Sequence, residues 1–196
     1  FCAGADIKAW GALSAFEFSR NWIRDGHRIF SRLARLPQPT IAVISGHAFG
    51  GGLELATACA LRVASPNATF SLPETRIGIV PGWSGTQRLS GHIPPAILKE
   101  MALLGNRLTA SRACELGFIN AVADDPRLVA MEMAEQICKK SPRATEVAKS
   151  MILSAHGEDR DAMVEALGGG MISASGDRAE GVSAFLEKRR PEFPGS

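Results

Sequence analysis

The chain has 196 residues, of which 45% are hydrophobic, so it can bury the core of one globular domain and is not disordered throughout. Lysine and arginine (22) almost balance aspartate and glutamate (20), and the formal net charge of +2 gives no argument for a nucleic-acid partner. The four cysteines are widely spaced without a C-x-x-C pair, so the sequence predicts neither a metal site nor a disulfide framework.

The ends of the chain and its apolar runs bear on membranes and targeting. No apolar run is long enough to cross a bilayer and no signal peptide is visible, so we expect no membrane partner. The chain begins with Phe1 rather than methionine, in a segment that resembles the tail of a strand. We therefore expect an upstream portion of the protein, which could carry targeting information.

The first half of the chain predicts alternating helices and strands. Apolar residues between positions 12 and 36 recur at roughly helical spacing, and Pro37 and Pro39 end that helix. Gly46 ends the β-favouring run that follows. The predicted elements after the first helix are a strand at 40–44, a helix at 51–60, and strands at 61–64 and 69–72.

The second half predicts mainly helices. Capping residues, prolines and glycines mark helices at 94–105, 109–117, 126–140, 142–155 and about 177–190, with a short strand at 118–122. Gly168, Gly169 and Gly170 interrupt a helical pattern, which predicts a break or a flexible elbow. The sequence thus predicts an α/β core at residues 1–125 and a helical region at 126–196.

Two glutamates each stand just behind a turn, Glu54 after three glycines and Glu74 after Pro73. Glycines at a helix start let a ligand approach the backbone and leave N–H groups unpaired at the positive end of the helix dipole. A second glycine-bearing turn, at Gly4, offers another donor. Each glutamate alone is more often a surface residue. Together, two donors and two carboxylates indicate a carbonyl activated on one side and protons moved on the other.

Other motifs fail at one residue each. Gly46 and Gly51 have phosphate-loop spacing, but Gly52 stands where that loop needs lysine, and Leu55 replaces the third glycine of a dinucleotide fingerprint. The segment 82–86 lacks the closing glycine of a nucleophile elbow, and nothing in the sequence assigns Ser84 a histidine partner. We therefore expect a loop there.

The chain resembles the enoyl-CoA hydratase/isomerase (crotonase) superfamily along its whole length. The segments that carry the resemblance are 1–8 (FCAGADIK), 46–54 (GHAFGGGLE), 73–89 (PETRIGIVPGWSGTQRL) and 180–191 (EGVSAFLEKRRP). The resemblance implies an α/β fold of the ClpP/crotonase type, a ββα spiral core followed by a C-terminal helical trimerisation region. It also implies that early strands of the family fold lie upstream of Phe1.

The resemblance assigns roles to particular positions. The N–H groups of Ala5 and Gly51 would form the oxyanion hole for the thioester oxygen, and Glu54 and Glu74 would be the catalytic carboxylates. Trp83 and Ser84 stand where hydratases commonly have small residues, so we expect Trp83 to shorten or reshape the acyl pocket. The substrate-binding positions implied are Ala3, Asp6, Ile7 and Lys8 for the CoA moiety, Gly82 and Trp83 for the acyl group, and Phe185 and Lys188 in the tail.

The predicted function is a hydro-lyase that adds water to a trans-2-enoyl-CoA thioester. No metal or redox cofactor is implied, because coenzyme A is part of the substrate. The resemblance further implies a homo-oligomer, a trimer or a dimer of trimers, in the cytoplasm of a bacterium or the mitochondrial matrix of a eukaryote. Two alternatives stay open: a double-bond isomerase, which can act with a single glutamate, and a non-catalytic or RNA-binding protein on the same scaffold.

Overall fold

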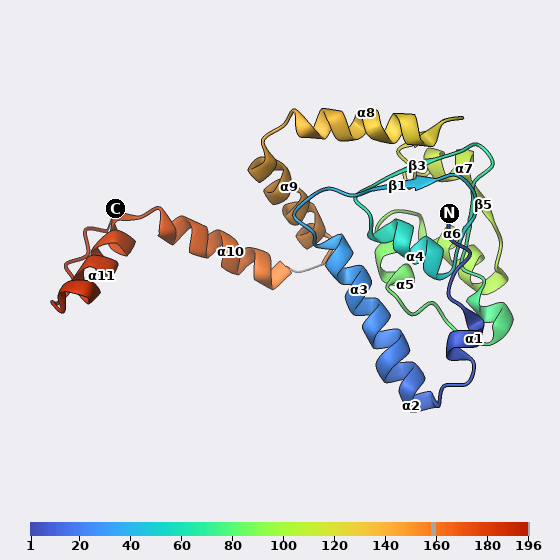
Figure 1. Ribbon diagram of the computed structural model, residues 1–196, viewed down its shortest axis with the longest axis horizontal. Coiled ribbons are helices and arrows are strands. Elements are labelled where there is room, and N and C mark those ends of the chain that lie inside the picture. Colours follow the sequence, from blue (N-terminus) through green and yellow to red (C-terminus); the bar gives the residue numbers. More distant parts are fainter. Residues whose placement is uncertain (158–159, 196) are drawn as a thin grey trace. The chain divides into compact units, whose positions relative to one another are not determined.

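The computed structural model describes residues 1–157 and 160–195. The chain divides into two compact units, Phe1–Lys149 and Ser150–Ser196, and each is described by itself (Figure 1). The division at residue 125 that the sequence suggested stays a prediction.

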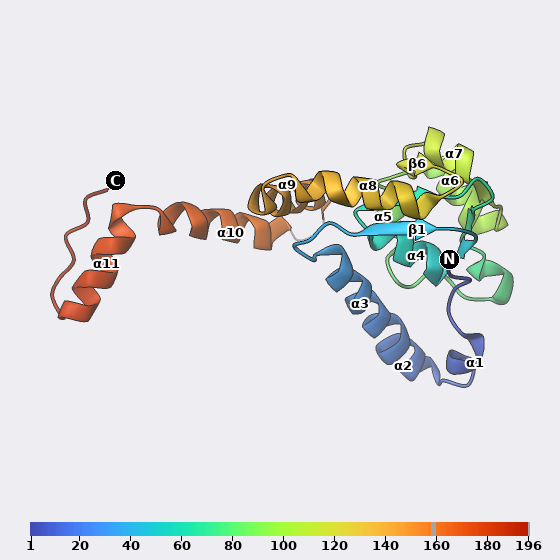
Figure 2. The ribbon, with the colours of Figure 1, turned by 45° about the horizontal axis from the view of Figure 1, so that its top comes forward.

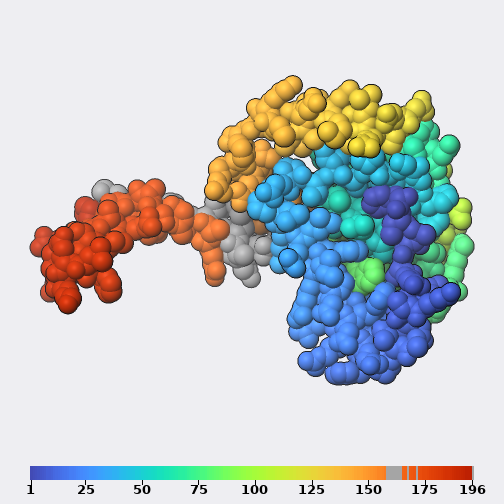
Figure 3. Space-filling model, in the orientation of Figure 1, coloured from blue at the N-terminus to red at the C-terminus, as the bar shows by residue number. Residues whose placement is uncertain are grey.

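The strands of the described residues form two sheets of three strands each. The first sheet is parallel, in the order β1 (Ile41–Ile44), β3 (Leu61–Ala64), β6 (Ala121–Val122). In the second, β4 (Thr69–Ser71) pairs in parallel with β2 (Ala48–Phe49) and antiparallel with β5 (Leu108–Thr109). A bridge between Cys2 and Ala48 brings the N-terminal segment, dark blue in Figure 3, against this second sheet.

Helices surround these sheets. Those of the first unit are α1 (Ile7–Trp10), α2 (Ala15–Glu17), η1 (Phe18–Ile23), α3 (Arg24–Ala34), α4 (Gly51–Ala58), η2 (Glu74–Ile77), α5 (Gly85–Leu89), α6 (Pro95–Lys99), η3 (Glu100–Leu104), α7 (Ala110–Glu115) and α8 (Pro126–Cys138). Helix α9 (Pro142–Ala155) runs across the border of the two units, and α10 (Arg160–Ser173) and α11 (Gly176–Glu187) belong to the second.

Helix α8 packs on β1 and β3, and α4 lies on the other side of that sheet (Figures 1 and 2). At the start of α4, Gly52 lets the N-terminal segment approach closely: a Cβ atom built on Gly52 would clash with the carbonyl oxygen of Cys2. The core around the sheets holds the largest fully buried side chains, among them Phe70, Phe118, Ile44, Leu53, Leu72 and Leu89. This core fixes the start of α4, where the predicted site lies.

Several predicted helix ends are confirmed by their caps. Helix α3 ends at Ala34, ahead of the prolines. Thr109 caps α7 by accepting a hydrogen bond from the backbone N–H of Arg112, 3.3 Å away. Gly105, with φ +66°, ends η3 in the left-handed conformation that suits glycine.

Two local predictions need correction. The strand expected at 118–122 forms only at β6, because Phe118 and Ile119 turn into the core instead. Helix α10 runs through Gly168–Gly170 without the predicted break or elbow. An added Cβ would meet nothing within 4 Å at these glycines, so packing does not account for them.

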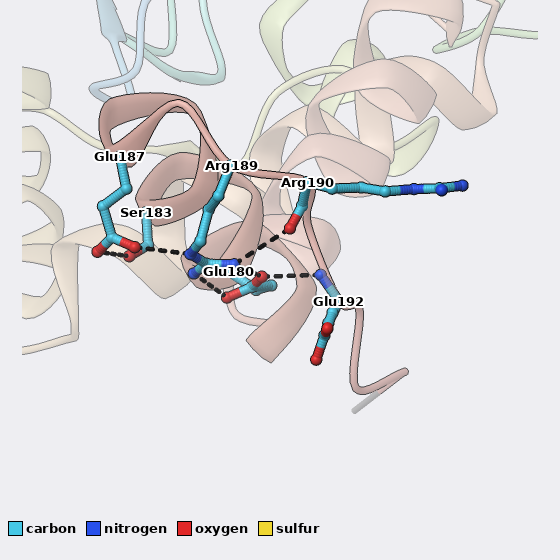
Figure 4. Close-up of polar contacts among 6 residues, drawn as sticks. All are labelled: Glu180, Ser183, Glu187, Arg189, Arg190 and Glu192. Atoms are coloured by element: carbon cyan, nitrogen blue, oxygen red, sulfur yellow. Dashed lines mark hydrogen bonds and ion pairs between the residues drawn. The ribbon is translucent and has the colours of Figure 1, made fainter.

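The last helix ends earlier than its pattern predicts. Helix α11 stops at Glu187, and Lys188, with φ 56°, leaves it in the left-handed region. Arg189 then turns back and pairs with Glu180 and Glu187 (Figure 4). Its hydrogen bond to Glu180 holds the pKa of that carboxyl well below its usual range, at about 2. Lys188 therefore lies just outside the helix that carries Phe185.

Candidate active site

A cavity of about 300 Å³ opens in the first unit, at the start of α4. It is lined by the N-terminal turn, helices α1 and η1, the glycine turn with the first turn of α4, and residues 73–83. Among the residues that line it are Ala3, Ala5, Ile7, Gly51, Glu54, Glu74, Gly82 and Trp83.

Two backbone donors face this cavity from neighbouring turns. A Cβ atom built on Gly51 would lie 3.7 Å from the nitrogen of Ala5, so the two N–H groups are close together. Gly51 is the first residue of α4, where a helix has no partner for its N–H. Within the part of the chain that the structure describes, neither N–H group donates to a protein acceptor. Together they can receive an oxygen that gains negative charge.

Glu54 lies in the first turn of α4 and is 3% exposed. Its Oε1 accepts hydrogen bonds from the backbone N–H groups of Trp83, at 2.7 Å, and Gly85, at 2.8 Å. Burial raises the pKa of Glu54, while these two bonds and the charge of Arg88 act in the opposite direction. The main chain thus stabilises the ionised form of a carboxyl that its surroundings otherwise desolvate.

Glu74 begins η2 and has different surroundings. It is 8% exposed, and its Oε2 is buried without a hydrogen-bond partner among the described residues. Burial, with a contribution from the charge of Glu54, raises the pKa of Glu74 to about 7. Burial raises the pKa of both carboxyls, but their partners differ. Glu54 has two backbone donors that favour its charged form, whereas Glu74 keeps its proton up to about neutral pH.

The indole of Trp83 forms one wall of the cavity. Its ring centroid lies 5.4 Å from that of Trp22 and 5.3 Å from that of Phe30, and its Nε1 donates to the carbonyl of Trp22 at 3.1 Å. An added Cβ at Gly51 would come within 2.7 Å of this ring, and one at Gly26 would clash with it. The ring is therefore held in place on several sides.

The structure brings most of the predicted site residues together around the cavity. Those that line the cavity are Ala3, Ala5, Ile7, Gly51, Glu54, Glu74, Gly82 and Trp83. Asp6 and Lys8 are exposed and do not line the cavity. Asp6 caps α1 instead, by accepting a hydrogen bond from the N–H of Lys8 at 2.9 Å. Phe185 and Lys188 belong to the second unit, where Phe185 is 83% exposed.

Sequence reasoning missed several residues around the site. Trp10, Phe18 and Trp22 also line the cavity. Their local sequence does not distinguish them from ordinary apolar residues of a helix. The segment expected to be a loop at 82–86 begins helix α5 at Gly85. Ser84 there has a histidine partner after all, His27, whose Nδ1 lies 2.8 Å from its Oγ. No group of histidine, cysteine and acidic residues able to hold a metal occurs among the described residues.

Comparison with known proteins gives the family. The family model described as enoyl-CoA hydratase/isomerase matches residues 1–196. The chain is 39% identical to a probable mitochondrial enoyl-CoA hydratase 2 of Arabidopsis thaliana, all of this chain aligning with 66% of that protein. It is 37% identical to a probable enoyl-CoA hydratase of Bacillus subtilis, all of this chain aligning with 78% of that protein.

A solved structure shows the same fold. The enoyl-CoA hydratase from Bacillus anthracis superposes with a TM-score of 0.76 at 36% identity, over 100% of this chain and 77% of that one. The protein therefore belongs to the enoyl-CoA hydratase/isomerase (crotonase) superfamily, with the α/β crotonase fold and C-terminal helices. The chain spans about two thirds of the length of the Arabidopsis relative. Across the described residues, no helix has both the length and the apolar character that a membrane span requires.

Proposed function

We propose that the protein is a hydro-lyase that adds water to the double bond of trans-2-enoyl-CoA thioesters. The observation that carries the proposal is the pairing of two differently solvated carboxyls, Glu54 and Glu74, with two free backbone donors around one cavity. The relatives named as enoyl-CoA hydratases support the same reaction class.

The donors would act on the thioester oxygen. As water adds to the β-carbon, this oxygen gains negative charge in an enolate, and fixed N–H groups in a dry site stabilise such a charge strongly. The N–H groups of Ala5 and Gly51 lie close enough to share one oxygen. The reaction changes no oxidation state in total, and we propose that it uses groups of the chain alone, with no metal or redox cofactor.

The two carboxyls would divide the proton transfers. Glu54, held by two backbone N–H groups, is the base that orients water and takes its proton. Glu74, with its pKa raised to about 7, is the acid that delivers a proton to the α-carbon. In the reverse dehydration the roles of acid and base are exchanged.

Product identification tests the proposal. The full chain is incubated with crotonyl-CoA and the products are identified by mass spectrometry and chromatography. A hydratase yields 3-hydroxybutyryl-CoA, heavier than the substrate by one water. A double-bond isomerase, offered a 3-enoyl-CoA, yields a product of unchanged mass, and that result without hydration would replace our proposal with the isomerase. Binding of RNA with no turnover of either thioester would favour the non-catalytic alternative.

Two further features belong to the proposal. The exposed apolar side chains of α11, among them Phe185 and Leu186, support the homo-oligomer that the family resemblance implies, a trimer or a dimer of trimers. Their burial in such an assembly would remove a large apolar area from water. The bacterial and mitochondrial relatives support a compartment that depends on the source: bacterial cytoplasm or mitochondrial matrix.

A further inference from the structure

Ser84 stands between the two residues that hold Glu54. The N–H groups of Trp83 and Gly85, its chain neighbours on either side, both donate to Oε1 of Glu54. The direction of these two N–H groups therefore depends on the backbone of Ser84, which links them.

The backbone of Ser84 adopts a conformation that serine does not favour. Its φ is 77° and its ψ is 16°, in the left-handed region. Non-glycine residues rarely adopt this conformation, which is strained and persists only where the surroundings hold it. Its surroundings must therefore stabilise this turn.

His27 supplies such a contact. Its Nδ1 lies 2.8 Å from the Oγ of Ser84, which is 6% exposed. The neighbouring Gly26 lies against the indole of Trp83, where an added Cβ would clash. One turn of α3 thus holds both the hydroxyl of residue 84 and the ring of residue 83.

We propose that His27 and Ser84 form a positioning pair, which holds the turn at residues 83–85 so that both backbone N–H groups point at the carboxylate of Glu54. The inference rests on the proposed function, in which Glu54 is the base. His27 does not line the cavity, so it acts through the turn rather than on the substrate.

Loss of the pair would change Glu54 in a defined way. Without the bond, Ser84 is free to relax from the left-handed region, and the two N–H groups lose their alignment. The carboxylate then keeps its burial and loses donors that favour its charged form, so its pKa rises further. The other charged groups that act on it, Arg88 and Glu74, stay in place.

The test uses substitutions at both partners in the full chain. His27→Ala and Ser84→Ala are expected to lower kcat for crotonyl-CoA by about 10- to 100-fold, as for other misplaced catalytic groups, with KM changed less than about twofold. The acid limb of the pH profile of kcat/KM should move to higher pH in both variants, because Glu54 ionises later.

Conservative variants separate this role from a general effect on folding. Asparagine carries a polar atom where histidine has Nδ1, so His27→Asn should restore most of the activity. Glutamine carries its amide at the position of Nε2, so His27→Gln should stay impaired. Glycine adopts a positive φ freely, so Ser84→Gly should retain more activity than Ser84→Ala. If either alanine variant fails to fold, these variants still test the inference.

The outcomes that overturn the inference are specific. They are alanine variants with kcat within about twofold of the parent, a loss confined to KM, or equal behaviour of His27→Asn and His27→Gln. If the parent protein itself does not hydrate enoyl-CoA, the proposed function fails separately. The pair is then tested by carboxyl NMR of Glu54, assigned with Glu54→Gln, where an unchanged pKa in His27→Ala would overturn it.

Discussion

Gly50 and the carboxyl of Glu74 lie so close together that a Cβ atom added to Gly50 would come within 2.9 Å of Oε1 of Glu74. Gly50 also has φ 51° and ψ −125°, a conformation that is essentially restricted to glycine. One residue therefore shapes the turn that presents the Gly51 donor and leaves room for the acid.

Gly50→Ala should impair both stability and activity. We expect the free energy of unfolding to fall by about 1–3 kcal/mol from backbone strain, and turnover to fall by about 100-fold from the displaced carboxyl. Gly78→Ala is the matched control, because Gly78 also has a positive φ, 74°, but nothing within 4 Å of an added Cβ. Urea unfolding and turnover of both variants check this. Equal loss of turnover in the control would show that strain alone is responsible.

Glu54→Gln and Glu74→Gln should each fold normally and lower hydration by about 10²- to 10⁴-fold, the usual contribution of a general acid or base. Because Glu74 must carry a proton to act as the acid, kcat/KM of the parent should fall as the pH rises through about 7. This limb should be absent from the residual activity of Glu74→Gln. Near-normal turnover in either folded variant would refute the assignment of that residue.

Stability should depend on pH through Glu74 in a predictable direction. Its pKa in the folded state, about 7, is above the ordinary value of 4.5, so the folded state binds the proton more tightly than the unfolded state. The stabilising contribution is complete below pH 4.5 and is lost as the pH rises through about 7. Urea unfolding across this range should show a slope that Glu74→Gln reduces. If Glu74→Gln leaves the slope unchanged, other titratable groups dominate the pH dependence of stability, with Glu54 as the first candidate.

Trp83→Ala should enlarge the acyl pocket. We expect kcat/KM for long enoyl chains to rise relative to crotonyl-CoA by about 10-fold or more, since each added methylene in an apolar pocket is worth about 1–3 kcal/mol. The same change should destabilise the fold by about 3–5 kcal/mol, because the ring packs on Trp22 and Phe30. Trp83→Phe keeps an aromatic ring and serves as the control. A chain-length profile that does not move in Trp83→Ala would exclude the indole as the limit of the pocket.

Phe185→Glu should weaken the proposed assembly. Phe185 is 83% exposed in the single chain, and a charge there would oppose its burial against another copy. We expect a smaller particle in sizing experiments and, if the tail contributes to CoA binding, a higher KM for CoA thioesters. Phe16→Glu, at another exposed phenylalanine (67%), controls for added charge. Unchanged size and kinetics in Phe185→Glu would leave α11 as a solvated helix.

Local signals in the sequence were sufficient for most of the architecture. Prolines, caps and glycines act within a few residues, so the ends of α3, α7 and η3 followed from them. The glycine turn and the two glutamates could be singled out from their local sequence, and the structure places all of them around one cavity, while their catalytic roles stay a prediction. The two-residue strands β2 and β5 were not, since strands so short exist only through their pairing partners.

The contacts that complete the site depend on tertiary packing and were not predictable from local patterns. Ser84 and His27 are 57 positions apart, and so nothing in either local sequence indicates the other. Trp83 and Trp22 are likewise distant, and their contact depends on how η1 crosses the turn before α5. The early end of α11 is accompanied by ion pairs of Arg189 that helical periodicity does not reveal.

The hydrogen bonds that orient Glu54 come from the main chain, and main-chain groups are the same whatever side chains they carry. At position 83 the side chain can therefore vary with the acyl group to be bound while the N–H still serves the carboxylate. Position 85 lacks this freedom, because a Cβ there would come within 2.7 Å of the Cγ of Glu54. Within one turn, then, a change of side chain at residue 83 alters the wall of the cavity, whereas a side chain at residue 85 would displace the carboxyl itself.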